Sequence, residues 1–121
     1  MKNLSTLRRQ QDLDRVFEAG RWRRLHAVAI GVYHRDDDER SRLAFVAGQR
    51  IGTAVRRNRS RRRMREAVRT LSDEIMPGAD IVLAARNAAA DVAFDRLQEQ
   101  IREVLEAEGL LGAAKARDRP R

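Results

Sequence analysis

The 121-residue sequence contains no cysteine, two prolines and only 4% aromatic residues. The lack of cysteine excludes disulfide bonds and thiolate metal sites, and it makes a reducing cytoplasm the simplest location. The sequence also lacks any apolar run near the roughly 20 residues that a bilayer-spanning helix needs. Its first residues have no apolar core of the kind found in export signals. We therefore expect a cytoplasmic protein with no membrane segment.

Lysine is scarce as well, and arginine carries nearly all of the positive charge. The net charge is +8, and nine arginines with a single acid, Glu66, lie between Arg50 and Arg69. Subtracting this segment from the chain's 26 basic and 18 acidic residues leaves 17 of each. The whole excess of charge therefore lies in one short segment, which indicates a site for a polyanion rather than a generally basic surface.

Hydrophobic residues make up 42% of the sequence, which suffices for the core of one compact domain. Apolar residues at helical spacing, such as Leu13, Val16 and Phe17, alternate along the chain with short strand-like runs. The predicted elements are a helix at 10–20, a strand at 26–34, a return strand at 42–48, an arginine-rich helix at 54–75, a buried strand at 80–85 and a helix at 91–108.

This order predicts an α/β (α+β) two-layer sandwich. We expect a small four-stranded sheet, counting one further short strand, with about three helices, in the order α-β-β-(β)-α-β-α. The strand at 42–48 is expected to be the hairpin partner of the strand at 26–34. Along the chain we predict a flexible basic arm at 1–10, a single domain at 11–108 and a disordered tail at 109–121.

The segment RIGTAVRRNRSRRRMREAVRT, residues 50–70, combines arginines with apolar residues. On a helix that turns about 100° per residue, one face carries Met64, Val68, Leu71 and Ile75. The opposite face carries Asn58, Arg62, Arg65 and Arg69. Like charges at this spacing repel one another by about 0.2–0.5 kcal/mol per pair. The face is therefore better explained by a bound polyanion than by simple solvation, the ordinary role of a charged face.

At these residues the sequence resembles the protein subunit of bacterial ribonuclease P. That family's signature joins a basic-isoleucine-glycine stretch to alanine-valine, an arginine-asparagine-arginine triplet and further basic residues. The matching residues here are Arg50-Ile51-Gly52, Ala54-Val55, Arg57-Asn58-Arg59, Arg61-Arg62 and Arg65. The segments DLDRVFEAG and GADIVLAAR also resemble the family, and the likeness covers roughly residues 4–106.

The resemblance implies both a fold and a function. The arginine-rich helix would follow a left-handed crossover in a small α/β sandwich. The partner would be a large catalytic RNA, one copy with one copy of the protein. Together they would remove the 5′ leader of precursor tRNA by hydrolysis, and the RNA would hold the Mg²⁺ ions of the active site. The chain itself would then be the RNA-binding domain of a ribonucleoprotein endonuclease.

The resemblance and the face of arginines together predict two contact sites. The predicted RNA contacts are Arg50, Arg57, Asn58, Arg59, Arg61, Arg62, Arg65 and Arg69. A cleft between the first helix and the sheet is predicted to bind the leader through Phe17, Leu13, Tyr33 and Arg86. Taken alone, Phe17 lies in an apolar helix stripe and is more typical of a core residue than of a ligand platform, so its place in the cleft is what the resemblance implies. Leu13 stands where the family often has phenylalanine, so leader binding is expected to depend more on charge and less on stacking.

The residues show no sign of chemistry carried by the chain itself. There is no nucleophile–base pair and no spaced carboxylate set, so we expect no catalytic residue and no metal site in the protein. The acids at 36–39 are more typical of a solvated turn. Three other functions stay open: a structural RNA-binding protein, a helix-turn-helix DNA-binding protein and a self-sufficient nuclease. The second needs a short helix where a strand is predicted, and the third needs an acidic cluster.

Overall fold

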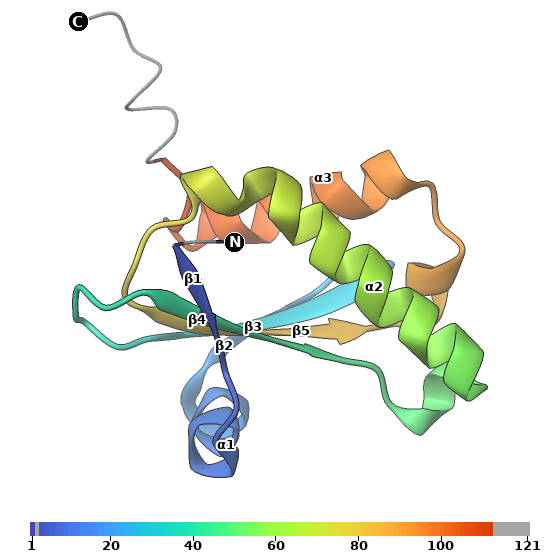
Figure 1. The fold of residues 1–121 in the computed structure, drawn as a ribbon, viewed down its shortest axis with the longest axis horizontal. Coiled ribbons are helices and arrows are strands. Elements are labelled where there is room, and N and C mark those ends of the chain that lie inside the picture. Colours follow the sequence, from blue (N-terminus) through green and yellow to red (C-terminus); the bar gives the residue numbers. More distant parts are fainter. Residues whose placement is uncertain (2, 113–121) are drawn as a thin grey trace, which may run out of the picture.

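The computed structural model describes residue 1 and residues 3–112, and in this part of the chain three helices pack on a five-stranded sheet (Figure 1). The helices are α1 (Gln10–Ala19), α2 (Ala54–Leu71) and α3 (Phe94–Ala107). The strands are β1 (Leu4–Thr6), β2 (Arg21–Arg24), β3 (Val28–His34), β4 (Ser41–Val46) and β5 (Ala79–Ala85). Their order across the sheet is β1-β4-β5-β3-β2.

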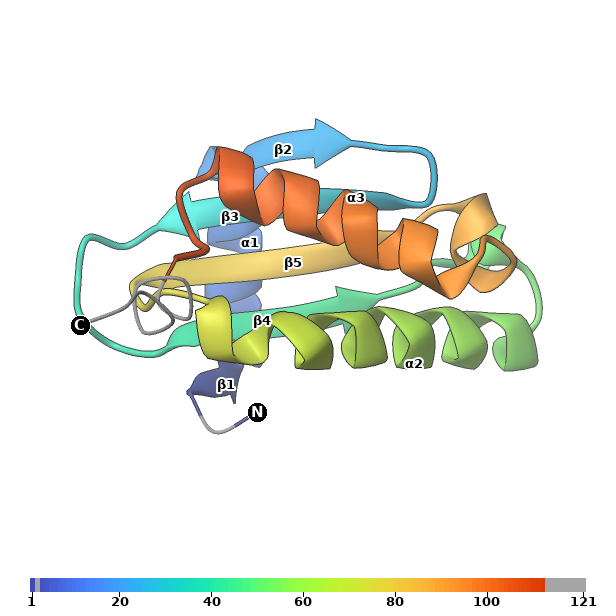
Figure 2. The same cartoon turned by 90° about the horizontal axis from the view of Figure 1, so that it is seen from above.

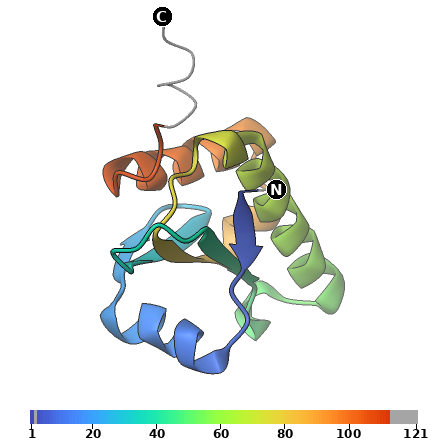
Figure 3. The same ribbon diagram turned by 60° about the vertical axis from the view of Figure 1, so that its left-hand side comes forward.

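The predicted α+β class is confirmed, and the sheet has five strands where four were predicted. Helices α2 and α3 cover one face of the sheet, and α1 covers part of the other (Figures 1 and 3). The sheet therefore carries helices on both faces, beyond the two layers that were predicted. The core between the sheet and the helix pair α2–α3 includes Ile30, Met64, Ile81, Leu97 and Ile101, all fully buried.

The predicted hairpin between the strands near 26–34 and 42–48 is wrong. Strand β5 lies between β3 and β4, antiparallel to the first and parallel to the second. The physical reason is that β5 is apolar on both faces, so it is most stable at the centre of the sheet with a neighbour on each side. The polar residues 35–40 form a connection long enough to pass from β3 to β4 over the end of β5.

The crossover from β4 through α2 to β5 is left-handed. In Figure 2, α2 lies in front of the sheet, both strands run to the right, and β5 lies above β4. Such parallel crossovers are right-handed in about 98% of cases. The handedness agrees with the prediction, and it brings α2 over the β4 side of the sheet rather than over its centre.

The chain ends are more ordered than predicted. Residues 1–10 were expected to form a flexible arm, but Leu4–Thr6 pairs with β4 in parallel and Leu7 is buried. Of the predicted tail at 109–121, Leu110 is buried and Leu111 bridges to Ile75, while residues 113–121 lie outside the described part of the chain. A three-residue strand has no detectable periodicity, which is why β1 was not predicted.

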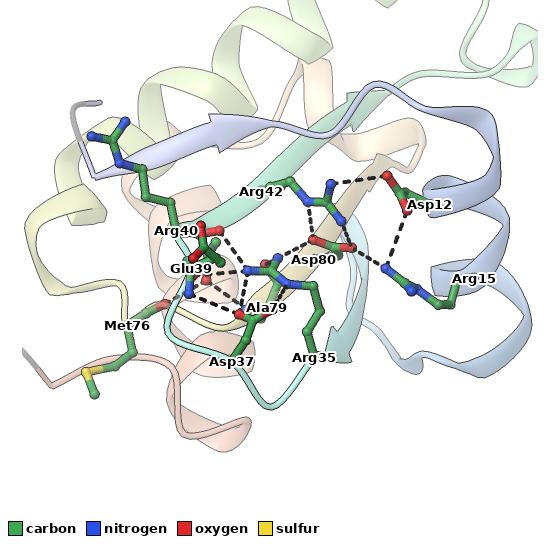
Figure 4. Close-up of polar contacts among 11 residues, drawn as sticks. Asp12, Arg15, Arg35, Asp37, Glu39, Arg40, Arg42, Met76, Ala79 and Asp80 are labelled. Atoms are coloured by element: carbon green, nitrogen blue, oxygen red, sulfur yellow. Dashed lines mark hydrogen bonds and ion pairs between the residues drawn. The ribbon is translucent and has the colours of Figure 1, made fainter.

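A buried carboxylate fixes α1 to the sheet. Asp80, at the start of β5, is fully buried, and Arg42 of β4 donates two 2.7 Å hydrogen bonds to its two oxygens (Figure 4). Arg35 donates a further bond of 2.5 Å to Asp80, and Arg15 of α1 lies 3.3 Å away. Asp12 of α1 accepts a 3.1 Å bond from Arg42, so α1 is held at two points. This cluster, the Asp80 network, sets the orientation of α1 against β4 and β5.

The Asp80 network predicts that the stability of the protein falls in acid. Burial alone raises the pKa of Asp80, but hydrogen bonds and charges from Arg42 and Arg35 outweigh it and hold the pKa below its usual value. A carboxylate whose pKa is lowered by folding stabilises the fold above its unfolded pKa, about 3.9 for aspartate. That contribution is lost as the pH falls through the folded pKa.

We expect Asp80→Asn to lower the free energy of unfolding by about 3–5 kcal/mol at pH 7, because Arg15, Arg35 and Arg42 lose a buried charged partner. Urea titrations of wild type and variant between pH 7 and pH 3 would show the two curves converging below about pH 4. The exposed Asp38→Asn is the matched control and should follow the wild type. Parallel curves for Asp80→Asn and wild type would show that this carboxylate does not carry the acid sensitivity.

Candidate nucleic-acid interface

Helix α2 forms as predicted, with its apolar stripe buried against the sheet. Met64, Val68 and Leu71 are at most 3% exposed, and the helix begins where the Thr53 hydroxyl accepts a hydrogen bond from the Arg56 amide. Gly52, just before it, has a φ of 118°, which glycine adopts without strain. With the stripe buried, the arginines of the helix point in three other directions.

One group of arginines holds α2 to the segment that follows β5. Arg56 forms a 2.6 Å ion pair with Asp91. Arg59 Nε and Arg63 Nη1 donate bonds of 2.8 and 2.6 Å to backbone carbonyls within residues 89–90. Burial and the neighbouring charge of Arg59 lower the pKa of Arg63. These three arginines are satisfied within the protein, although Arg59 stays exposed enough to reach a second partner.

A second group lies along the first turns of α2. Arg57 Nη1 donates a 2.7 Å bond to the Gly52 carbonyl, and Arg61 bonds to the side-chain oxygen of Asn58. Both arginines are half-buried, whereas Asn58 is exposed. These contacts hold the predicted triplet around Asn58 close to the amino end of the helix, where free backbone amides favour an anion.

The third group is exposed to solvent and consists of Arg62, Arg65 and Arg69 of α2, together with Arg50 in the 3-10 turn that precedes the helix. Arg69 pairs with Glu66 at 3.2 Å, and the Arg65 guanidinium lies 5.2 Å from the centre of the Phe45 ring. The side chains of Arg50 and Arg62 make no hydrogen bond or ion pair with the residues that the structure describes. These four side chains, called the cationic face below, are the ones best placed to contact phosphate groups.

A groove joins the cationic face to α1. Its lining includes Arg65 of α2, Phe45 and Val46 of β4, Leu13 of α1 and the strand β1. The two predicted sites, one on the arginine-rich helix and one beside the first helix, are therefore continuous. A single strand that contacts α2 could follow the groove to α1.

The predicted cleft residues are only partly brought together. Leu13 and Phe17 lie on one flank of α1, and Phe17 is 54% exposed. Tyr33 lies beneath the guanidinium of Arg15, 4.6 Å from it, on the opposite flank. Arg86 follows β5 and, by strand alternation, belongs to the sheet face that α1 covers in part. The structure thus places Leu13 and Phe17 together on one flank of α1 and separates Tyr33, whose ring is covered by Arg15.

The sequence reasoning gave no role in the cleft to Trp22, whose ring stacks on Phe17 with centroids 5.1 Å apart. A signal was present, because Gly31 interrupts the apolar strand that pairs with Trp22. A glycine inside a strand often marks a place where another group approaches the backbone closely. The arginines on either side of Trp22 hid the strand β2 to which it belongs.

Other kinds of site find less support in the described residues. In residue 1 and residues 3–112 there is no group of three His, Cys, Asp or Glu side chains that could hold a metal ion. Every helix in that part of the chain is too short or too polar to cross a bilayer. A 3-10 turn at Gln49–Ile51 follows β4 and precedes α2, in place of the first helix of a helix-turn-helix.

Comparison with known proteins gives a consistent result. A profile of the family described as Ribonuclease P matches residues 1–108. The "Ribonuclease P protein component" of Symbiobacterium thermophilum is 37% identical over 111 residues, covering 92% of this chain and 96% of that protein. That of a Roseiflexus species is 51% identical over 75 residues, covering 61% and 62%. The solved structure of the RNase P protein from Thermotoga maritima is 27% identical in sequence, with a TM-score of 0.73, and the match covers 85% of this chain and 96% of that one.

We expect Arg62→Ala combined with Arg65→Ala to weaken binding to a large structured RNA. Each lost phosphate contact lowers the slope of log K against log salt by about one, so the double variant should lose about two. Filter-binding titrations at several salt concentrations measure this slope. The matched control is Arg40→Ala with Arg96→Ala, which removes the same charge from exposed sites outside α2. An unchanged slope in the α2 variant would mean that these two arginines do not contact phosphate.

Proposed function

The chain belongs to the ribonuclease P protein family, and on that premise we propose that it binds the catalytic RNA of this endoribonuclease and the 5′ leader of precursor tRNA. The observation that carries the proposal is the cationic face of α2, which continues into a groove bounded by α1. A structured RNA offers a dense array of phosphates to the cationic face, and an extended single strand fits the groove.

The cationic face supplies electrostatic rather than chemical catalysis. Arginine forks onto phosphate oxygens with two parallel hydrogen bonds, and it keeps its charge at any physiological pH. Four such side chains on one exposed surface offset repulsion where the substrate meets the catalytic RNA. The eight positions from Arg50 to Arg69 that the motif predicts are proposed as RNA contacts, with Arg50 and Arg62 the least engaged within the protein.

The chemical step is assigned to the RNA, with Mg²⁺ as its cofactor. The described lining of the groove contains no acidic side chain, and Asp12 and Asp80 are engaged by Arg42, so the donor set does not suit a magnesium ion held by the protein. No step of the proposal passes through a metal bound to this chain. The protein lowers the Mg²⁺ concentration that the RNA needs, because its arginines neutralise phosphates that Mg²⁺ would otherwise screen.

The remaining parts of the proposal follow from the same division of labour. One copy of the protein binds one copy of the RNA, since α2 presents a single cationic face. The complex would act on precursor tRNA in the cytoplasm. The leader would lie in the groove, with Leu13 and Phe17 on the α1 side and Arg86 at the end of β5.

The proposal predicts that the protein and a bacterial ribonuclease P RNA act together. A precursor tRNA with a 5′ extension is incubated at low Mg²⁺ with the protein alone, the RNA alone, or both. We expect cleavage at the mature 5′ end only in the combined sample, because the RNA lacks sufficient charge neutralisation without the protein. Gel analysis of the products gives the position and the rate of cleavage.

The three samples also distinguish the alternatives. Cleavage by the protein alone would indicate a self-sufficient nuclease and would overturn the assignment of the chemistry to RNA. Salt-dependent RNA binding without any effect on cleavage would indicate a structural RNA-binding protein. Raising Mg²⁺ should restore cleavage by the RNA alone and so provides the positive control for the RNA preparation.

A further inference from the structure

We propose that Trp22 is a positioning residue that holds Phe17 as a stacking platform for one base of a single-stranded RNA. The inference rests on the proposed function, since it concerns the leader that the α1 cleft would bind. It adds a residue from β2, a strand with no predicted role, and a defined place for a base.

The Trp22 ring lies flat against the backbone of the sheet at Gly31. A Cβ atom placed on Gly31 would come within 2.3 Å of Trp22 Cε2 and within 2.5 Å of Cζ2, distances that real side chains do not reach. Only glycine at this position lets the indole lie so close. Its Nε1 donates a 3.1 Å hydrogen bond to the Val16 carbonyl, which fixes the ring to α1 as well.

Contacts on the other face of β2 also fix this strand, so the Trp22 indole has little freedom to move. Glu108, at the end of α3, accepts a 3.2 Å hydrogen bond from Arg23 and lies 3.8 Å from Arg21. These two arginines flank Trp22 in sequence and point to the opposite face of the sheet. Trp22 is thus fixed by its neighbours on β2, by Gly31 beneath it and by α1 beside it.

Phe17 stacks on the fixed indole and leaves its outer face open. The two ring centroids are 5.1 Å apart and the planes differ by 24°. Phe17 is nevertheless 54% exposed, so the ring remains accessible to a ligand. A phenyl ring supported on one side keeps one orientation, so a base that stacks on the open side loses less entropy than it would on a mobile ring.

Two arginines without side-chain partners among the described residues lie on the sheet face that carries Trp22. Arg24, two residues after Trp22 on β2, points to the same face, as does Arg86 after β5. Both are exposed, and neither makes a hydrogen bond or ion pair with its side chain among the described residues. Between them Ala29 and Ala84 pair directly across β3 and β5 and leave a low floor. A ring, a low floor and two free guanidinium groups match the base and flanking phosphates of one nucleotide in a single strand.

The test compares leader-bearing and leaderless substrates in the assembled complex. The ratio of their dissociation constants, the leader advantage, is measured for wild type, Trp22→Leu and Trp22→Phe, using a tRNA with a five-nucleotide leader of adenosines and the mature tRNA. We expect Trp22→Leu to lower the leader advantage by roughly tenfold, at the low end of the range for a base stacked on an aromatic ring. Trp22→Phe keeps a ring beneath Phe17 and should retain most of it.

Two further variants separate positioning from general damage to the fold. Gly31→Ala leaves the indole intact but displaces it from the sheet, so it should reduce the leader advantage as Trp22→Leu does. Gly48→Ala is the matched control, because a Cβ there meets no atom within 4 Å. Affinity for the catalytic RNA, which depends on α2, should be unchanged in all four variants.

Each result of these measurements either supports or overturns the role of Trp22 in positioning Phe17. An unchanged leader advantage in Trp22→Leu overturns the platform and leaves the proposed function intact. A loss of affinity for the catalytic RNA in Trp22→Leu makes Trp22 a residue of the fold and also overturns it. If the wild type shows no leader advantage but still stimulates cleavage, the leader-binding part of the proposed function fails, and the platform fails with it.

Discussion

The arrangement of the cleft depends on one buried carboxylate. Asp80 lies at the start of the central strand and has no access to water, so its charge must be matched by arginines that reach it from other elements. Arg42 comes from the neighbouring strand, Arg35 from the connection after β3 and Arg15 from α1. A buried ion cluster of this kind is weak evidence for added stability, since desolvation offsets much of its attraction. What it does supply is geometry, because few orientations of α1 satisfy Asp80 and Asp12 together.

That geometry decides which side of α1 is free for binding. Arg15 faces the Asp80 network, so Leu13 and Phe17, about half a turn away, lie on the opposite flank of α1. On the sheet face where α1 lies, α1 covers only part of the strands (Figure 2). If α1 were rotated by a third of a turn, Phe17 would enter the core and the Phe17–Trp22 stack would be lost. The exposure of Phe17 is therefore a consequence of how the Asp80 network holds the helix.

Helix α2 faces a different constraint, because its cations lie near the end of the helix that repels them. The amino end of a helix carries partial positive charge, and Arg56 and Arg57 stand in its first turn. The protein offsets part of this by pairing Arg56 with Asp91 and by binding Arg57 to a backbone carbonyl. Further along the helix, the side chains of Arg62 and Arg65 form no ion pair with the residues that the structure describes. A bound polyanion would supply the missing negative charge. The charge distribution of the helix therefore supports the proposed binding of RNA.

The sequence predicted the elements whose periodicity is strong and missed those defined by contacts between distant residues. Helices α1, α2 and α3 and the central strand β5 are confirmed because their apolar residues recur at regular spacing. Strand β2 was hidden by its arginines, which an edge strand tolerates since one side faces solvent. The hairpin was wrong because the apolar run at 80–85 indicated a central strand but did not indicate which two strands lie beside it. In the same way, the motif identified the arginines of α2 but did not indicate which of them form hydrogen bonds or ion pairs with the segment after β5.

The left-handed crossover explains why the cationic face and the cleft can act on one molecule. A right-handed crossover would lead from β4 to a parallel strand on the opposite side of β4 from β5. Helix α2 would then lie away from the flank of α1 that carries Leu13 and Phe17. As built, α2 runs along the β4 side of the sheet, and Arg65 and Leu13 line the same groove from opposite faces. An RNA strand leaving a structured region on α2 meets charge first and aromatic rings afterwards. In the proposed function this order separates two tasks, since phosphate contacts hold any RNA and the stacking platform responds only to an extended strand.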